Sequence, residues 1–471
     1  MEEKENTYSY PPLYDCSKDD TNEAGVCNKI PDAYENEESS KDKLQLSSDK
    51  NNKISAHGIG VLTAGIFIVG EVCGAGVVTF PQAMSKTGWL GLPLMLVLLF
   101  VCTYCGVLLG YAWKRAKHHR LETEPIRDPY PFIGEIAFGK KGRHAVTVCL
   151  NTVLFFGCVI YLILCAEILQ SIYSFHIGLT PGISSLRIWL LIISVVIIPF
   201  TWLGTPKDFW FVGVGAAFST TLAVILIITK YILIRPNEIN SVEKAPVTTR
   251  SFSSAFGTIV FGYTGAGLFP TIQSDMKNPT KFVQAASIGY AGIGLLYIPT
   301  AVGGFLTIGK DLNDSILETL THYDHTHNLN HGIVAAAELL FASHFLCAFV
   351  LTINPLVQQM ERFFNVPYEF SRQRIYFRTL AVLLVCATCE VFPQFGPIVD
   401  LIGGSLNVFL CFFFPISFYL KLYPETKLGP KLIMGFICFI ALIGGVLATT
   451  FNILNIKESI NELYFKHGGQ K

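Results

Sequence analysis

The chain has 471 residues, of which 51% are apolar and 15% are charged, whereas about 25% of the residues in an ordinary soluble protein are charged. The mean hydropathy of +0.45 indicates a membrane protein rather than several soluble domains. Basic and acidic residues both number 35, so the net charge is zero, which argues against a nucleic-acid partner bound through its phosphates. The composition also excludes a disordered chain and a small disulfide scaffold.

Residues 1–56 form a polar segment with 13 acidic and 7 basic side chains and no signal-peptide pattern. We expect this segment to be a disordered cytosolic tail. It contains Pro11-Pro12-Leu13-Tyr14, a P-P-x-Y pattern that resembles the ligands of WW domains. Pro11, Pro12 and Tyr14 therefore predict a WW-domain ubiquitin ligase as a partner, although so short a motif is weak evidence.

From residue 57 onward, apolar runs alternate with short polar stretches. A helix needs about 20 apolar residues to cross a bilayer, and eleven runs satisfy this requirement. Their bounds are roughly 59–84, 89–113, 144–173, 186–204, 208–234, 252–275, 282–307, 332–356, 375–395, 397–421 and 429–453. We expect an all-α integral membrane protein, with a transmembrane domain over residues 57–456 and a short lumenal or extracellular tail over residues 457–471.

The distribution of basic residues predicts the orientation of these spans. With the N-terminus in the cytosol, the inward loops contain 18 Lys and Arg residues and the outward loops contain 7, as the positive-inside rule requires. The reverse topology is the alternative. The sequon Asn313-Asp314-Ser315 then lies in an outward loop and predicts glycosylation of Asn313. A plasma membrane and an endosomal or lysosomal membrane both fit this topology.

The cysteines predict no disulfide framework. Eleven of the 13 fall inside apolar runs, and the two C-x-x-C pairs, at Cys102 with Cys105 and Cys386 with Cys389, lie in the middle of expected helices. We interpret these pairs as small packing residues.

The first and sixth runs are interrupted by glycines that precede a proline. The residues are Gly70, Gly74 and Gly76 before Pro81, and Gly262, Gly265 and Gly267 before Pro270. Each glycine costs a helix about 1 kcal/mol relative to alanine, and unwound backbone in a bilayer is tolerated only where it lines a cavity inside the protein. Matched interruptions in two halves therefore predict two broken helices around a transport site. The alternative is that the glycines only allow close packing of helices.

The spacing of the two broken helices predicts the symmetry of the fold. Five spans separate their starting points, and because five is odd the second copy enters the membrane from the opposite side. We expect spans 1–5 and 6–10 to form an inverted repeat, with span eleven left over. The N-terminus of a half-helix suits a carboxylate, and the carbonyl end of the opposing half suits an ammonium or sodium ion. A site with both ends matches the zwitterion of an amino acid.

Two motifs resemble the first and sixth helices of the amino acid/auxin permease family. The first motif is G-A-G-V-V-T-F-P-Q-A, which starts at Gly74 and is followed by Gly88-Trp89. The second motif is G-Y-T-G, which starts at Gly262 and is followed by F-P-T-I-Q and M-K-N-P. The stretch Ile133 to Gly139 resembles the re-entrant segment of that family. The resemblance covers about residues 55–455 and implies the eleven-helix fold of leucine-transporter-like proteins and the sodium- or proton-coupled transport of amino acids. Ala266 and Glu71 differ from the residues usual in the family at these positions, so the resemblance supports the class of protein but leaves the substrate and the coupling ion open.

We expect the substrate to bind at the two glycine-rich breaks. The candidate residues are Gly74, Ala75, Gly76, Tyr161, Tyr263, Thr264, Gly265, Ala266 and Gly267. Tyr161, in the middle of span three, would donate to the substrate carboxylate or close a gate, or it is a packed aromatic residue. No cofactor or metal ion is expected, because no nucleophile–base pair or metal-ligand cluster is apparent; the histidines of loop seven fit no metal template.

Two residues are candidates for coupling transport to an ion gradient. Glu71 is a carboxylate in a broken helix, where charge is costly, and would carry a proton; alternatively, it caps backbone N–H groups. Thr352, before Asn354-Pro355 in span eight, matches hydroxyl ligands of sodium in sodium-coupled family members, or it bonds to its own helix. The other ionisable residues in the spans are Glu167, Glu338, His344 and Asp400, which we interpret as structural or facing a vestibule.

The sequence thus predicts a secondary active transporter of small neutral amino acids that works by alternating access. An alternative from another class is a sensor that binds an amino acid in the same pocket and signals through the N-terminal tail. A passive channel is disfavoured because paired broken helices occlude a site instead of forming a pore. An enzyme has no support in the sequence.

Overall fold

The computed structural model describes residues 58–118, 126, 128–173, 185–202, 210–234, 242–327, 329, 331–367 and 370–468. The chain separates into residues 1–54 and residues 55–471, and all described residues belong to the second unit. The P-P-x-Y motif at Pro11, Pro12 and Tyr14 lies outside the described residues and remains a prediction. Within these ranges every regular element is a helix, apart from one isolated β-bridge between Ile59 and Met276.

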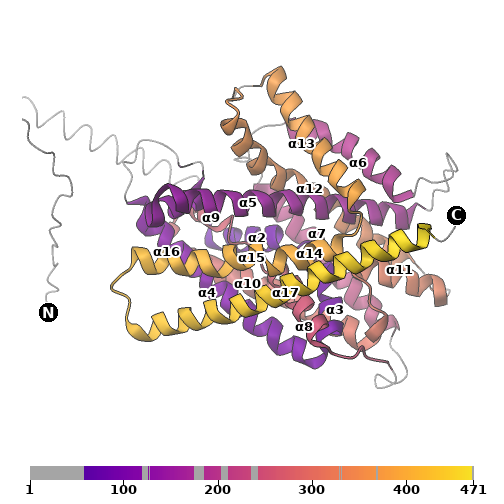
Figure 1. Cartoon of the computed structure of the whole chain (residues 1–471). Helices are drawn as coiled ribbons and strands as arrows, with labels where there is room; N and C mark the ends of the chain where they lie inside the picture. Colours follow the sequence, from indigo (N-terminus) through magenta and orange to yellow (C-terminus); the bar gives the residue numbers. More distant parts are fainter. Residues whose placement is uncertain are drawn as a thin grey trace, which may run out of the picture. The chain divides into compact units, whose positions relative to one another are not determined.

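Each of the eleven expected spans coincides with a helix or a broken pair of helices (Figure 1). The broken pairs are α2 (Val61–Val72) with α3 (Ala75–Thr87) and α8 (Thr249–Gly262) with α9 (Phe269–Asp275). The other spans are α4 (Gly91–Lys117), α5 (Pro129–Ile172), α6 (Ser185–Trp202), α7 (Trp210–Ile234), α10 (Phe282–Thr307), α12 (Gly332–Phe363), α13 (Arg372–Val391), α14 (Phe395–Gly404) with its continuation, and α17 (Leu428–Gly468). Eight helical stretches of the described chain are long and apolar enough to cross a membrane by length and composition.

Three elements differ from a simple row of spans. The tenth span is interrupted at Ser405 and continues through α15 (Leu406–Val408), a π-helical turn (Phe409–Phe413) and α16 (Phe414–Leu422). Pro415 explains the wider turn, because proline lacks the N–H needed for an ordinary helical bond. α5 contains a kink at Phe138 and Gly139, where the glycine has φ = +67°, a conformation that favours glycine.

The third difference is an additional helix, α11 (Ile316–His327), within loop seven. It forms because Ile316, Leu317 and Leu320 recur at helical spacing and are buried on one face. His322, His325 and His327 lie on its exposed face, as in a solvated segment. Asn313 precedes this helix and is exposed to solvent, but its glycosylation remains a prediction.

Equivalent glycine contacts occur in the two halves of the transmembrane domain. A Cβ atom on Gly70 of α2 would overlap the carbonyl oxygen of Gly213 on α7, and a Cβ atom on Gly403 of α14 would overlap the carbonyl oxygen of Gly257 on α8. These contacts join span one to span five and span six to span ten. The helices thus touch backbone to backbone at matching places, as the expected inverted repeat requires.

Gly403→Ala is expected to destabilise the protein, because the added methyl group meets a backbone carbonyl that cannot rotate away. Overpacking of this kind costs about 1–3 kcal/mol. The matched control is Gly215→Ala on α7, where no atom lies within 4 Å of the added Cβ. Thermal unfolding of both variants in detergent measures the effect. Equal melting temperatures for the two variants would show that the α8–α14 contact is looser than described.

Candidate functional site

The first break separates α2 from α3 at Cys73 and Gly74. Both residues leave the helical region, with ψ = 74° at Cys73 and ψ = −104° at Gly74. Gly74 is tightly enclosed: a Cβ atom there would lie 2.7 Å from Nε2 of His344 and 3.4 Å from Cε1 of Tyr161. A side chain at position 74 would therefore fill the space between α2, α5 and α12.

The second break, over residues 263–268, lies directly against the first. A Cβ atom on Gly265 would be only 2.6 Å from Cγ2 of Val72, the last residue of α2. Tyr263, which follows α8, is buried and already departs from helical geometry, with ψ = 3°. The two breaks thus meet inside the protein, which is the arrangement that matched interruptions predicted.

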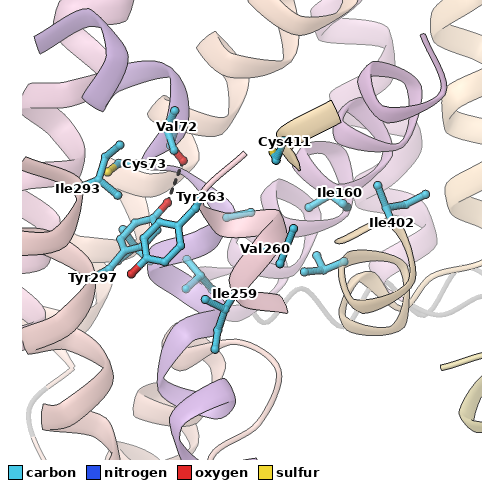
Figure 2. Close-up of a cluster of buried hydrophobic side chains, with 14 of the residues drawn as sticks. Val72, Cys73, Ile160, Ile259, Val260, Tyr263, Ile293, Tyr297, Ile402 and Cys411 are labelled. Atoms are coloured by element: carbon cyan, nitrogen blue, oxygen red, sulfur yellow. Dashed lines mark hydrogen bonds between the residues drawn. The ribbon is translucent and has the colours of Figure 1, made fainter. Parts of the chain in front are cut away.

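Two tyrosines of α10 bind carbonyl groups at the two breaks, one of which, that of Val72, also accepts from the Gly74 N–H at 3.0 Å. The Tyr297 hydroxyl lies 2.8 Å from the Val72 oxygen, a bond drawn in Figure 2, and 3.1 Å from the Gly262 oxygen. The Tyr290 hydroxyl donates to the Tyr263 oxygen at 3.0 Å. The single proton of Tyr297 is therefore shared between the carbonyl ends of α2 and α8. These contacts satisfy groups that a bilayer would otherwise leave unpaired.

An aromatic cluster fills the space beside the two breaks. The rings of Tyr263 and Tyr297 are stacked with centroids 5.7 Å apart, and they overlap in the view of Figure 2. Phe80 of α3 packs edge-on against both rings, at 5.2 Å and 4.4 Å. A Cβ atom on Gly76 would overlap the Tyr297 hydroxyl. The surroundings of the breaks leave little room for added side chains.

The other expected site residues lie around this centre. Ala75 begins α3 and is buried, as is Ala266, whereas Thr264 and Gly267 are partly exposed. The Thr264 hydroxyl donates to the Val260 oxygen at 2.8 Å. A Cβ atom on Gly267 would lie 2.7 Å from Cδ1 of Leu150 on α5. Their role in substrate binding remains a prediction.

The three side chains proposed to bind substrate or ions occupy different places. Tyr161 stacks on Phe345 with centroids 5.9 Å apart and faces Gly74. Glu71, in the last turn of α2, is half-buried and interacts electrostatically with Tyr161. Thr352 is half-buried, and its methyl carbon would lie 3.5 Å from a Cβ atom on Gly157 of α5. Glu71 and Tyr161 therefore lie near the first break, whereas Thr352 lies against Gly157 of α5.

The residues that the sequence interpretation missed are those that reach the breaks from other helices. Tyr290 and Tyr297 of α10, Thr220 of α7 and His344 of α12 all hydrogen-bond within this region. The sequence interpretation of His344 was a structural or vestibule-facing residue, and only its rarity as a histidine in an apolar helix could have singled it out. The tyrosines are unremarkable in sequence, because their partners are backbone oxygens distant along the chain.

A polar cavity of about 360 Å³ lies at one end of the site, lined by residues of α3, α8, α14 and α17. Within it, Nζ of Lys86 is 3.3 Å from Oδ2 of Asp400, whose side chain is 8% exposed. Asp400 also accepts hydrogen bonds from Ser254 and Thr258 of α8. One carboxylate therefore links α3, α8 and α14 and lines this cavity.

The chain matches a known family across its whole transmembrane domain. The model of the family described as "Transmembrane amino acid transporter protein" matches residues 57–454. The chain belongs to this family. Membership confirms the resemblance noted from the two glycine motifs, and it identifies a multi-pass membrane transporter rather than an enzyme.

Curated relatives and solved structures agree with this assignment. Amino acid transporter AVT1D of Arabidopsis thaliana is 28% identical over 80% of this chain and 66% of its own length. Amino acid transporter AVT1B of the same plant is 26% identical over 91% of this chain and 79% of its own length. The structure of MhsT in complex with L-phenylalanine is similar, with a TM-score of 0.55 at 15% identity over 83% of this chain and 98% of MhsT. Inward-facing Mhp1 has a TM-score of 0.50 at 13% identity, over 88% of this chain and 92% of Mhp1. The leucine-transporter-like fold is thereby confirmed.

Tyr297→Phe is expected to lower both thermal stability and amino acid uptake, because it removes the hydroxyl shared by the Val72 and Gly262 carbonyls. A buried polar group that loses its partner costs about 1–3 kcal/mol. Tyr231→Phe is the matched control, since the buried Tyr231 hydroxyl has no hydrogen-bond partner among the described residues. Unfolding in detergent and uptake into proteoliposomes compare the two variants. If Tyr297→Phe behaves like the control, the shared bond does not stabilise the breaks.

Proposed function

We propose that the protein is a secondary active transporter that carries small neutral amino acids across its membrane by alternating access, driven by a proton or sodium gradient. The observation that carries this proposal is the contact between two broken helices at Val72 and Gly265. The carbonyl end of α2 at Val72 thus lies beside the unwound segment between α8 and α9, and the N-terminal end of α3 begins at Ala75 across the same break. These two partial charges match the ammonium and the carboxylate of a zwitterion.

The size and charge of the surroundings support a small neutral substrate. Gly74, Gly76 and Gly265 admit no further carbon atoms without displacing a neighbour, and the stacked rings of Tyr263 and Tyr297 occupy the adjoining space. Glu71 is the only acidic residue of α2 and α3. A long or strongly charged amino acid side chain would find little space and little compensating charge here.

Contacts at opposite ends of the broken pairs support alternating access. At one end, Asp400 holds Lys86 of α3 together with Ser254 and Thr258 of α8. At the other end, the backbone of Ile59, just before α2, exchanges hydrogen bonds of 2.9 Å with Asp275 and Lys277, which flank the end of α9. Opening to either side requires one set of contacts to separate while the other holds.

Several finer features of the proposal follow from the sequence. A cytosolic N-terminus agrees with the basic residues of the inward loops, and the plasma membrane and the endolysosomal membrane remain the two candidate locations. Binding of a WW-domain ubiquitin ligase to Pro11, Pro12 and Tyr14 is a further proposal. The sensor alternative requires the tail of residues 1–56 for signalling, so deletion of the tail would abolish signalling but leave transport intact.

Uptake by purified protein in proteoliposomes tests the function directly. We expect tritiated alanine, glycine and serine to accumulate when a proton or sodium gradient is imposed, and unlabelled substrate inside the vesicles to accelerate exchange. Protein-free vesicles are the control. A folded protein that binds these amino acids without moving them would contradict transport and support the sensor.

Asp400→Asn is expected to reduce uptake about tenfold, the equivalent of about 1.4 kcal/mol. The substitution removes the charge that holds Lys86 and weakens the acceptor for Ser254 and Thr258. Glu243→Gln is the matched control, because Glu243 also pairs with a lysine, Lys310, but is 71% exposed, and such surface pairs contribute little. Initial uptake rates provide the measurement, and equal rates in both variants would exclude Asp400 from gating.

A further inference from the structure

His344 of α12 lies against the first break without belonging to either broken helix. The residue is buried, with 1% of its surface exposed. Its Nδ1 atom is 2.9 Å from the Thr220 hydroxyl of α7, and Thr220 donates to the Cys73 oxygen at 3.1 Å. A chain of two hydrogen bonds therefore connects the imidazole to the carbonyl group at the break itself.

The hydrogen-bond network assigns the hydrogen on the imidazole. Nδ1 of His344 also lies 3.3 Å from the Ala216 oxygen, which can only accept. If Nδ1 carries the hydrogen, it donates to Thr220 and Ala216, and the Thr220 proton remains available for Cys73. The opposite tautomer would leave the Cys73 and Ala216 oxygens without these donors. Nε2 of the neutral imidazole is therefore a bare acceptor.

Nε2 is the atom that faces the break. It is buried, and no partner for it exists among the described residues. A Cβ atom on Gly74 would lie only 2.7 Å from it. Buried polar atoms are normally paired, so an unpaired nitrogen at this place is available to a proton.

The groups that face His344 come from several helices packed around the first break. The first break contributes the Cys73 oxygen through Thr220, and α5 contributes Tyr161, which has Glu71 of α2 as a neighbour. Tyr297 of α10 bonds to the Val72 oxygen. α7 contributes Thr220 and the Ala216 carbonyl; its Lys230 is ten residues further along and pairs with Asp324 at 2.6 Å. On α12 itself, Glu338 accepts from Ser171 and Thr321. Gly74, next to the ring, lies between the carbonyl end of α2 and the N-terminal end of α3, whose partial charges are opposite in sign.

We propose that Nε2 of His344 is the proton-binding site that couples the proton gradient to transport, which makes the coupling ion a proton. This inference rests on the proposed function. A proton from the water on one side binds to Nε2 and yields an imidazolium, whose new N–H points at the break beside Gly74. When the break opens to the other side, the same proton leaves to that water. One proton crosses per cycle, and Thr352 needs no sodium ion.

The test compares proteoliposomes with and without an inward proton gradient. For the wild type, uptake of tritiated alanine, glycine and serine is expected to rise as the external pH falls, because protonation of a histidine drives the cycle. His344→Gln is expected to reduce the ratio of uptake with and without the gradient to about one and to flatten the pH profile. His322→Gln, at an exposed position of α11, is the control and should keep both. Melting temperatures in detergent establish that each variant is folded.

The possible outcomes separate this inference from the proposed function. Wild-type uptake that depends on sodium and not on pH overturns the proton site but leaves transport intact, whereas no uptake by folded wild type overturns transport itself. The inference is also overturned if the ratio of uptake with and without the gradient is the same in His344→Gln as in the wild type. It is likewise overturned if Glu71→Gln loses this gradient dependence and His344→Gln keeps it. If His344→Gln does not fold, the Thr220→Val variant provides the test. This substitution removes the hydroxyl between Nδ1 of His344 and the Cys73 oxygen, so it should shift the midpoint of the pH profile of uptake. An unshifted midpoint rejects the proposal.

Discussion

The carbonyl groups that two broken helices leave free inside a membrane are the constraint on which the rest of this structure depends. In a hydrocarbon environment each unpaired backbone group costs several kcal/mol, so a break survives only where other helices supply donors. Here Tyr297, Tyr290 and Thr220 supply them to the carbonyls at the ends of α2 and α8. The packing of α7 and α10 against the broken helices follows from that requirement.

The same contacts make the site able to change. A carbonyl bound by its own helix can be freed only by unfolding, whereas one bound by a side chain of another helix is released when the helices shift. Tyr297 divides one proton between the two halves of the inverted repeat, and Asp400 joins α3, α8 and α14 at one end. In the mechanism we propose, substrate and proton act on this same small set of hydrogen bonds.

Much of the fold was predictable because its signals are local. Glycines at positions 74, 76, 262 and 265 lower helix stability where they stand, so the two breaks could be located from the sequence, and the structure confirms both. Eleven apolar runs likewise predicted eleven spans. The interruption at Ser405 was not predicted, although Gly403 and Gly404 directly before it lower helix stability as the glycines of the two breaks do. The helix α11 was not predicted because it buries its apolar face only after loop seven folds back onto the domain.

The site itself was predictable only in part. By itself the sequence determined the membrane class, the broken helices, the inverted repeat and the family, because hydropathy, glycine content and short motifs act over a few residues. Only the tertiary structure decided that His344 and Thr220 meet Cys73 and that Tyr297 meets Val72 and Gly262. Most of these partners are more than 100 residues apart along the chain, and most of the acceptors are backbone oxygens, which every residue has. A pattern of side chains along the chain therefore cannot indicate which hydroxyl reaches which carbonyl.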